Sequence, residues 1–160
     1  MYLLKYKRLL MNIFLKCYNM KQEDKELLLK DLCGRVPYGV KCKYNDGVIV
    51  NILSVNFFYK QIEGWERYVN HTLKYDVEDI KPYLFPLSSM TEEQKIEIKS
   101  LCDGTEIFDD GGWMSYISIL GNFNFEINLA VVDWLNKNHF DYRGLIQMSL
   151  AIDATGLNIY

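Results

Sequence analysis

Val40-Lys41-Cys42-Lys43-Tyr44-Asn45-Asp46-Gly47-Val48 is the stretch that decides the fold of this chain. Apolar residues alternate with lysines over its first five positions, and a period of two is typical of a strand with one buried face. The Asn-Asp-Gly sequence that follows favours a tight hairpin turn. The stretch therefore predicts the first hairpin of an antiparallel sheet.

Two further strands are predicted after this turn. Residues Val48–Tyr59 are apolar on both faces, which indicates a central strand or one that bends midway. Residues 60–65 are interpreted as the next turn, around Gly64. The third strand places four residues on one face: Val69, His71, Leu73 and Tyr75. These elements predict a curled three-stranded meander, and Trp113–Leu120 is a candidate fourth strand.

Helices are predicted before and after the meander. Glu23–Cys33 contains the i,i+4 pairs Leu28/Leu32 and Leu29/Cys33 of a short amphipathic helix, closed by Gly34 and Pro37. Asp76–Ser89 is expected to leave the sheet, with residues 83–85 extended across the core because two prolines forbid a continuous helix. Residues 91–94, Thr-Glu-Glu-Gln, form a capping box that starts a helix reaching about Cys102 and burying Ile98.

The C-terminal region predicts a helical layer. An apolar stripe marks a helix that ends near Asn138, and its members are Phe125, Leu129, Val132 and Leu135. Asp141 is the expected N-cap of a last helix over Tyr142–Asp153. The predicted fold is therefore α+β: an N-terminal helix, a curled antiparallel meander of three to four strands, and a C-terminal helical layer, in one domain spanning 20–160.

Composition excludes several classes of protein. The chain has 160 residues, is 49% hydrophobic and carries a formal charge of −3, so it has no overall electrostatic attraction to nucleic acid or anionic lipid. Its four cysteines form no CxxC pair, and it lacks a glycine-rich phosphate loop, HExxH and GxSxG. Cys42 and His71, on neighbouring strands, make the only nucleophile–base pair that can be constructed. We therefore predict no metal, no cofactor and no catalytic residue.

Residues 1–19 are predicted separately. They are apolar and basic and imitate a signal peptide, but Asn12 interrupts the apolar run, and no small-residue cleavage site follows it. Met20 begins a more ordinary cytosolic start. We expect residues 1–19 to be an upstream translational extension of a cytoplasmic protein, with a short amphipathic membrane anchor as the alternative.

Two clusters are candidate binding surfaces. The segment Asp133–Ile146 gathers Trp134, His139, Tyr142 and Arg143 at a predicted corner between helices, where we expect a structural role more than a partner contact. A basic, partly aromatic outer sheet face is the second cluster, and its members are Lys41, Lys43, Arg67, Tyr68 and Lys74. Basic groups interleaved with an aromatic ring can bind single-stranded nucleic acid.

Three stretches carry a resemblance to a family. LLLKDLCGRVPYGV (27–40), IKPYLFPLSSMT (80–91) and the pair DWLN (133–136) with HFDYRGLI (139–146) resemble an uncharacterised group of small proteins from Bacteroides-type gut anaerobes, their prophages and other mobile elements. After Ala151 the chain departs from the pattern, because its tail lacks the acidic ending of that group. The resemblance implies a phage or mobile-element setting and no particular activity.

These observations favour a non-enzymatic accessory or protein-interaction module with a protein partner. A nucleic-acid-associated accessory protein that uses the basic sheet face is the first alternative. An enzyme of an unrecognised type is the second alternative. A membrane partner is expected only if residues 1–19 form a real anchor.

Overall fold

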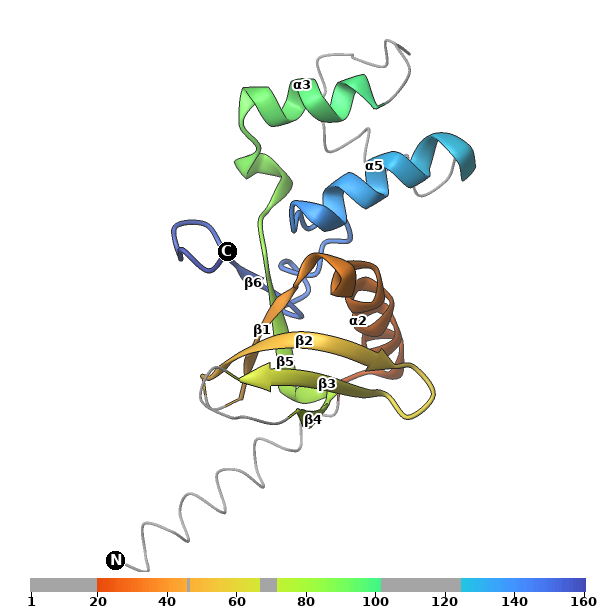
Figure 1. Cartoon of the computed structure of the whole chain (residues 1–160), viewed down its shortest axis with the longest axis vertical. Helices are drawn as coiled ribbons and strands as arrows, with labels where there is room; N and C mark the ends of the chain where they lie inside the picture. The colour runs from red at the N-terminus through yellow and green to blue at the C-terminus, as the bar shows by residue number, and fades with distance from the viewer. Residues whose placement is uncertain (1–19, 46, 67–71, 102–124) are drawn as a thin grey trace, which may run out of the picture.

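The computed structural model describes residues 20–45, 47–66, 72–101 and 125–160, with side chains placed from 129 in the last range. The expectations for residues 1–19, for the loop and strand between 103 and 120, and for Arg67, Tyr68, Val69 and His71 lie outside these residues. The described part is α+β, as predicted, with an N-terminal helix and one six-stranded mixed sheet. Figure 1 shows this sheet and helix α2 below a pair of helices, α3 and α5.

The sheet has the strand order β4-β3-β2-β1-β5-β6. Its strands are β1 (Lys41–Tyr44), β2 (Ile49–Asn56), β3 (Gln61–Glu66), β4 (Leu73–Asp76), β5 (Ile80–Leu84) and β6 (Ile152–Asp153). The first five strands pair antiparallel, whereas β6 pairs parallel with β5. The meander is therefore present, but it belongs to a larger sheet than the three to four antiparallel strands predicted.

The expectations of a central strand and of a bend midway are both confirmed for β2. It lies inside the sheet between β3 and β1, and a bulge between Ile52 and Ser54 shifts its register midway. The predicted turn around Gly64 is wrong, because Gly64 lies within β3 opposite Ile52. A Cβ at Gly64 would clash with Val50 Cγ1. The glycine therefore permits close packing inside the sheet, and it is not a turn residue.

The segment after β4 stays in the sheet, contrary to prediction. Residues 83–85 were expected to be extended, and the strand found is Ile80–Leu84, which pairs with β1 through Cys42 opposite Pro82. The missing amide of Pro82 leaves no gap on the other side of β5, because β6 pairs only with Tyr83 and Leu84. Sequence periodicity does not reveal such long-range pairing.

The helices are α2 (Gln22–Arg35), α3 (Glu92–Ser100) and α5 (Phe125–Lys137). Short 3-10 turns lie before β1, β5 and α3, and these are η1 (Val36–Tyr38), η2 (Val77–Asp79) and η3 (Leu87–Ser89). Both hydrogen bonds of the predicted capping box are present at α3. Two expectations about which residues the helices bury are wrong. Cys33 is exposed on α2, and Leu129 on α5 is 63% exposed while Val131, Trp134 and Leu135 are buried.

The predicted last helix is absent, and residues 142–150 form turns in its place. Both carboxylate oxygens of Asp141 accept backbone hydrogen bonds, from Leu145 N at 2.9 Å and Ile146 N at 2.8 Å. Gly144 and Ser149 have positive φ angles of 73° and 60°, which a right-handed helix does not allow. Asp141 therefore caps a compact turn.

The buried apolar residues form two clusters. The larger one lies between α2 and the sheet, around Leu28, Leu32 and Ile62. The smaller one joins α3 and α5 around Ile98, Trp134 and Phe140. None of the helices in the described ranges is long and apolar enough to cross a membrane.

Candidate functional site

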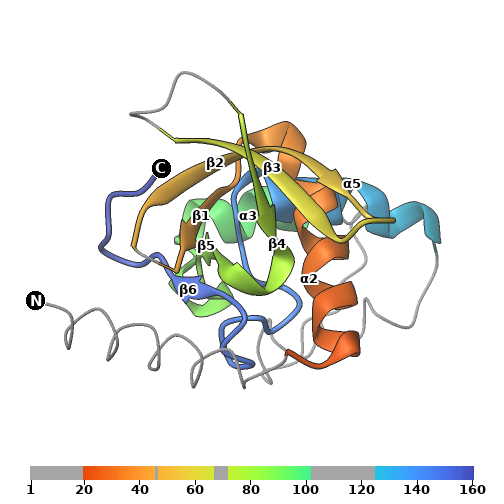
Figure 2. The same cartoon turned by 90° about the horizontal axis from the view of Figure 1, so that it is seen from below.

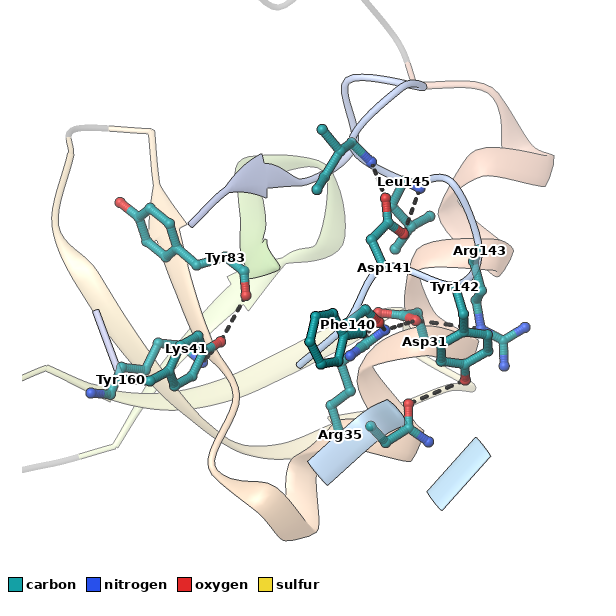
Figure 3. Close-up of polar contacts among 12 residues, drawn as sticks. Asp31, Arg35, Lys41, Tyr83, Phe140, Asp141, Tyr142, Arg143, Leu145 and Tyr160 are labelled. Atoms are coloured by element: carbon teal, nitrogen blue, oxygen red, sulfur yellow. Dashed lines mark hydrogen bonds and ion pairs between the residues drawn. The ribbon is translucent and has the colours of Figure 1, made fainter. Parts of the chain in front are cut away.

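A buried ion pair lies beneath the predicted corner. Arg35 Nε donates to Asp31 Oδ2 at 2.7 Å and Arg35 Nη2 donates to Asp31 Oδ1 at 3.0 Å, and neither side chain has exposed surface. Arg35 Nη2 also donates to the carbonyl oxygen of Phe140 at 2.8 Å. The pair thus fastens α2 to the C-terminal segment 105 residues away, as Figure 3 shows.

Arg143 and Tyr142 complete this cluster. Arg143 Nε lies 3.3 Å from Asp31 Oδ1, and about a third of its side chain is exposed. The guanidinium carbons of Arg35 and Arg143 lie 5.4 and 4.9 Å from the centre of the Tyr142 ring. The Tyr142 hydroxyl donates to Asn136 Oδ1 at 3.1 Å. These contacts tie Tyr142 and Arg143 to the fold.

The side chains of Trp134 and His139 also pack inside the fold. Trp134 is buried and stacks on Phe140 with a centroid distance of 5.7 Å. His139 is buried, has a φ of 57°, and stacks on Tyr160 at 3.8 Å. Burial, with smaller contributions from the charges of Arg35 and Lys41, lowers the pKa of His139 to about 4. Its imidazole is therefore neutral near pH 7.

The structure thus brings Trp134, His139, Tyr142 and Arg143 together at one corner, as the sequence suggested. Most of their surface contacts other parts of the same chain. A protein partner would reach mainly the outer part of Arg143. These contacts stabilise the fold, and they leave little of the four side chains exposed.

The predicted basic sheet face is only partly free. Lys41 Nζ donates to the Ile159 carbonyl at 2.6 Å and lies 5.5 Å from the Tyr160 ring centre. Lys74 Nζ lies 3.9 Å from Glu63 Oε1. Lys43 is exposed, and Lys81, which the sequence reasoning did not include, lies opposite it on β5 and is exposed as well.

The same face carries an exposed apolar group that the sequence reasoning missed. Ile49 and Leu53 of β2 are 40% and 53% exposed, and Trp65 of β3 is 40% exposed. Ile49 lies opposite Lys43, and Trp65 lies opposite Asn51, which places the apolar group beside the lysines. We name Ile49, Leu53 and Trp65 the outer-face group. Figure 2 shows helices α2, α3 and α5 behind β2 and β3, on the other side of the sheet.

The loop between β2 and β3 adds exposed aromatic rings. Phe57, Phe58 and Tyr59 are all exposed, and Phe58 reaches 85%. Asn56 Oδ1 accepts a hydrogen bond from Tyr59 N at 3.0 Å, so the loop has a defined turn. The signal in the sequence is the apolar run Val48–Tyr59, which predicts a central or bent strand, but the strand ends at Asn56 and the three aromatic residues lie beyond it.

The described residues offer little for catalysis. Cys42 is fully buried, and burial, together with the charge of Asp31, raises the pKa of its thiol well above the usual range. A thiol in that environment is a poor nucleophile. No group of three or more His, Cys, Asp or Glu within the described ranges is arranged to hold a metal ion. His71, its proposed partner, lies outside them.

Comparisons with known proteins do not indicate a function for this chain. A scan against protein-family models, a search of curated proteins and a search of solved structures each gave no match. The outer-face group, the two exposed lysines and the aromatic loop are therefore the features from which a function is argued.

Proposed function

We propose that this chain is a non-enzymatic accessory module that binds a protein partner through the outer face of its sheet. The observation that carries this proposal is the outer-face group, which exposes three large apolar side chains on two paired strands. Single exposed apolar residues are common, but contiguous ones rimmed by polar groups mark interaction surfaces. Tryptophan in particular is enriched among the residues that dominate binding energy.

The occupant is an apolar segment that also carries acidic residues. Lys43 on β1 lies between Ile49 on β2 and Lys81 on β5. Apolar groups of a partner would cover Ile49 and Trp65, while its carboxylates would lie beside the two ammonium groups. Residues 1–19 of this chain fit poorly, because they contain four basic residues and no acidic one.

A phage or mobile-element setting is part of this proposal. It rests on the sequence resemblance of residues 27–40, 80–91 and 133–146 alone.

A nucleic-acid-associated role is the second candidate, and one observation favours it. Trp65 shares the outer face with Lys43 and Lys81, which lie across β2 from it, and a face that combines a ring with cations can bind an unpaired strand. The charge on this face is reduced because Lys41 and Lys74 already have partners. Apolar contact with a protein therefore ranks first.

Selection from a displayed random-peptide library tests the proposal. We expect the enriched peptides to combine aliphatic or aromatic residues with Asp or Glu. Leu53→Asp should abolish binding of a synthetic enriched peptide, and Lys43→Glu should weaken it about tenfold. Leu129→Asp is the matched control, because Leu129 is also an exposed leucine and lies on α5, away from the outer face of the sheet. Equal loss with both leucine variants, or no enrichment, would reject the proposal.

A labelled single-stranded oligonucleotide at low salt distinguishes the second candidate. If the oligonucleotide binds, and Trp65→Ala together with Lys43→Glu removes that binding while no peptide is enriched, nucleic acid replaces protein as the partner. Absence of oligonucleotide binding leaves the protein-binding proposal as the explanation of the outer face.

A further inference from the structure

The side chain of Tyr160 bridges two strands of the sheet. The paired register of β1 and β5 ends with Cys42 opposite Pro82, and the next pair in that register is Lys41 with Tyr83. The Tyr160 hydroxyl accepts from Lys41 N at 3.3 Å and donates to the Tyr83 carbonyl at 2.8 Å, and Figure 3 shows the second of these bonds. A phenol hydroxyl can accept and donate at once. It therefore links the two backbones where their own pairing stops.

The ring of Tyr160 is held by aromatic neighbours and a cation. Its centre lies 3.8 Å from that of His139, with the two planes 12° apart, and 6.0 Å from that of Phe85. The ammonium of Lys41 lies 5.5 Å from the ring centre and donates to the Ile159 carbonyl at 2.6 Å. Burial raises the pKa of the Tyr160 hydroxyl, so it keeps the proton that it donates. We name the groups that hold this side chain the tyrosine slot: Lys41, Tyr83, Phe85 and His139.

The segment that carries Tyr160 is attached to the fold at its far end. Residues 155–158 are all exposed, and their two backbone bonds are local, from Thr155 N to Asp153 and from Leu157 N to Ala154. Among the described residues, the other hydrogen bonds and ring contacts of residues 155–160 all come from Ile159 and Tyr160. A segment with so few buried contacts opens at a lower free energy than a sheet does.

We infer that the tyrosine slot is a recognition site for a tyrosine side chain, and that residues 155–160 are its tethered ligand, which leaves and re-enters while the sheet stays folded. The two bonds to the hydroxyl give the slot its preference for a phenol over other rings. The tether supplies an effective concentration on the order of millimolar, so the closed form dominates. Release would free the ammonium of Lys41, which shares a strand face with Lys43. The inference does not depend on the protein partner proposed above.

Native-state hydrogen exchange of the full chain tests the release. The Lys41 amide is bound by the Tyr160 hydroxyl, whereas the Ile52 amide is bound by the Val40 carbonyl inside the sheet. We expect the Lys41 amide to exchange much faster than the Ile52 amide, at a rate that low urea does not change, as local opening requires. Tyr160→Phe keeps the ring and should speed exchange at Lys41 about tenfold without affecting Ile52. Equal rates with the same urea dependence would mean that the segment leaves only when the sheet unfolds, and would reject the inference.

The variant Tyr160→Ala removes the ligand side chain, so that a free phenol can take its place. The probe is p-cresol, with 4-methylanisole as an analogue that cannot donate and toluene as one that neither donates nor accepts. We expect p-cresol to bind this variant about tenfold more tightly than either analogue and to shift the Lys41 amide signal in NMR spectra. Tyr59→Ala is the matched control, because Tyr59 is an exposed tyrosine in the loop between β2 and β3. Equal binding of all three compounds, or equal binding to the control, would reject the slot.

An acetylated and amidated peptide of residues 157–160 tests whether the segment itself is the ligand. It should bind Tyr160→Ala more tightly than p-cresol does, because it adds the Ile159 carbonyl that Lys41 binds. Adding Lys41→Met should weaken the peptide about tenfold, whereas Lys43→Met, which changes an exposed lysine on the same strand, should not. Absence of peptide binding at millimolar concentration, or an equal loss with both lysine variants, would overturn the inference.

Discussion

Asp31 and Arg35 lie one turn apart on α2, and their side chains form a two-bond ion pair with no exposed surface. Arg35 also holds the Phe140 carbonyl, and Asp31 also meets Arg143. One carboxylate therefore contacts two guanidinium groups where the N-terminal helix meets the C-terminal corner. We therefore expect the loss of this carboxylate to destabilise the fold more than the loss of either cation beside it.

Asp31→Asn should lower the free energy of unfolding by about 3 to 5 kcal/mol, because it leaves a buried guanidinium without a counter-charge. Arg35→Met should cost less, since Arg143 still lies near the remaining carboxylate. Urea titration followed by circular dichroism measures both. The double variant Asp31→Leu with Arg35→Met should recover much of the loss, and strictly additive losses would contradict this account of the pair.

Asp141 is predicted to stabilise the turn that replaces the expected last helix. Asp141→Ala removes the acceptor of two backbone amides, so we expect a loss of about 2 to 3 kcal/mol in chemical denaturation. Asp141→Asn keeps one oxygen acceptor and should lose about half as much. Asp153→Ala is the matched control, because Asp153 is exposed and accepts a single amide. An equal effect at both positions would show that the turn does not depend on Asp141.

Local sequence rules predicted the local parts of this fold. Alternation predicted β1, Thr91 and Gln94 predicted the start of α3, and the leucine spacing predicted α2. The joining of β5 and β6 to the sheet was missed, because their partners are distant in the chain and a two-residue strand has no period. The prediction of a last helix was wrong because an N-cap residue such as Asp141 can cap a turn equally well.

The sequence predicted that the residues of the corner lie together, but it did not predict the ion pairs and hydrogen bonds that join them to α2. Leu28, Asp31, Leu32 and Arg35 have the i, i+3, i+4, i+7 spacing of one helical face, and this spacing placed both charges on the buried stripe. That signal was available in the sequence. The exposure of Ile49 and Leu53 was not, since an apolar strand has the same pattern whether its outer face is covered by its own chain or open to a partner.

Gly64→Ala should destabilise the protein by about 1 to 3 kcal/mol, because the new methyl group meets Val50 Cγ1 inside the sheet. Thermal unfolding and urea titration measure the loss. Combining it with Val50→Ala removes the atom that clashes, so the double variant should lose clearly less than the sum of the two single losses. Additive losses would mean that the glycine is required for another reason.

Cys42 and Cys33 should differ strongly in reactivity. Cys42 has no exposed surface, and burial raises the pKa of its thiol, whereas Cys33 is exposed on α2. Labelling with N-ethylmaleimide, followed by peptide mass spectrometry, should modify Cys33 at least about a thousandfold faster than Cys42 under native conditions. In urea the two rates should converge. Rates within tenfold of each other in the native protein would show that β1 opens far more readily than the packing implies.

His139 should make the fold sensitive to mild acid. Its pKa is about 4 in the folded chain, below its unfolded value near 6.5, because the imidazole is buried and lies near the charges of Arg35 and Lys41. The unfolded chain therefore binds the proton first as pH falls. The stability present above pH 6.5 should decrease by about 1.4 kcal/mol per pH unit until pH 4, where the folded form is protonated too.

The variant His139→Asn isolates this effect, because asparagine tolerates the positive φ of 57° and does not titrate. It should lose some stability at pH 7 through the missing contact with Tyr160. Between pH 6.5 and pH 4 its stability should decrease less steeply than that of the wild type, and the carboxylates common to both proteins cancel in the comparison. Urea titrations at half-unit intervals of pH provide the measurement. Parallel curves for the two proteins would mean that His139 is already protonated, or exposed, in the folded chain.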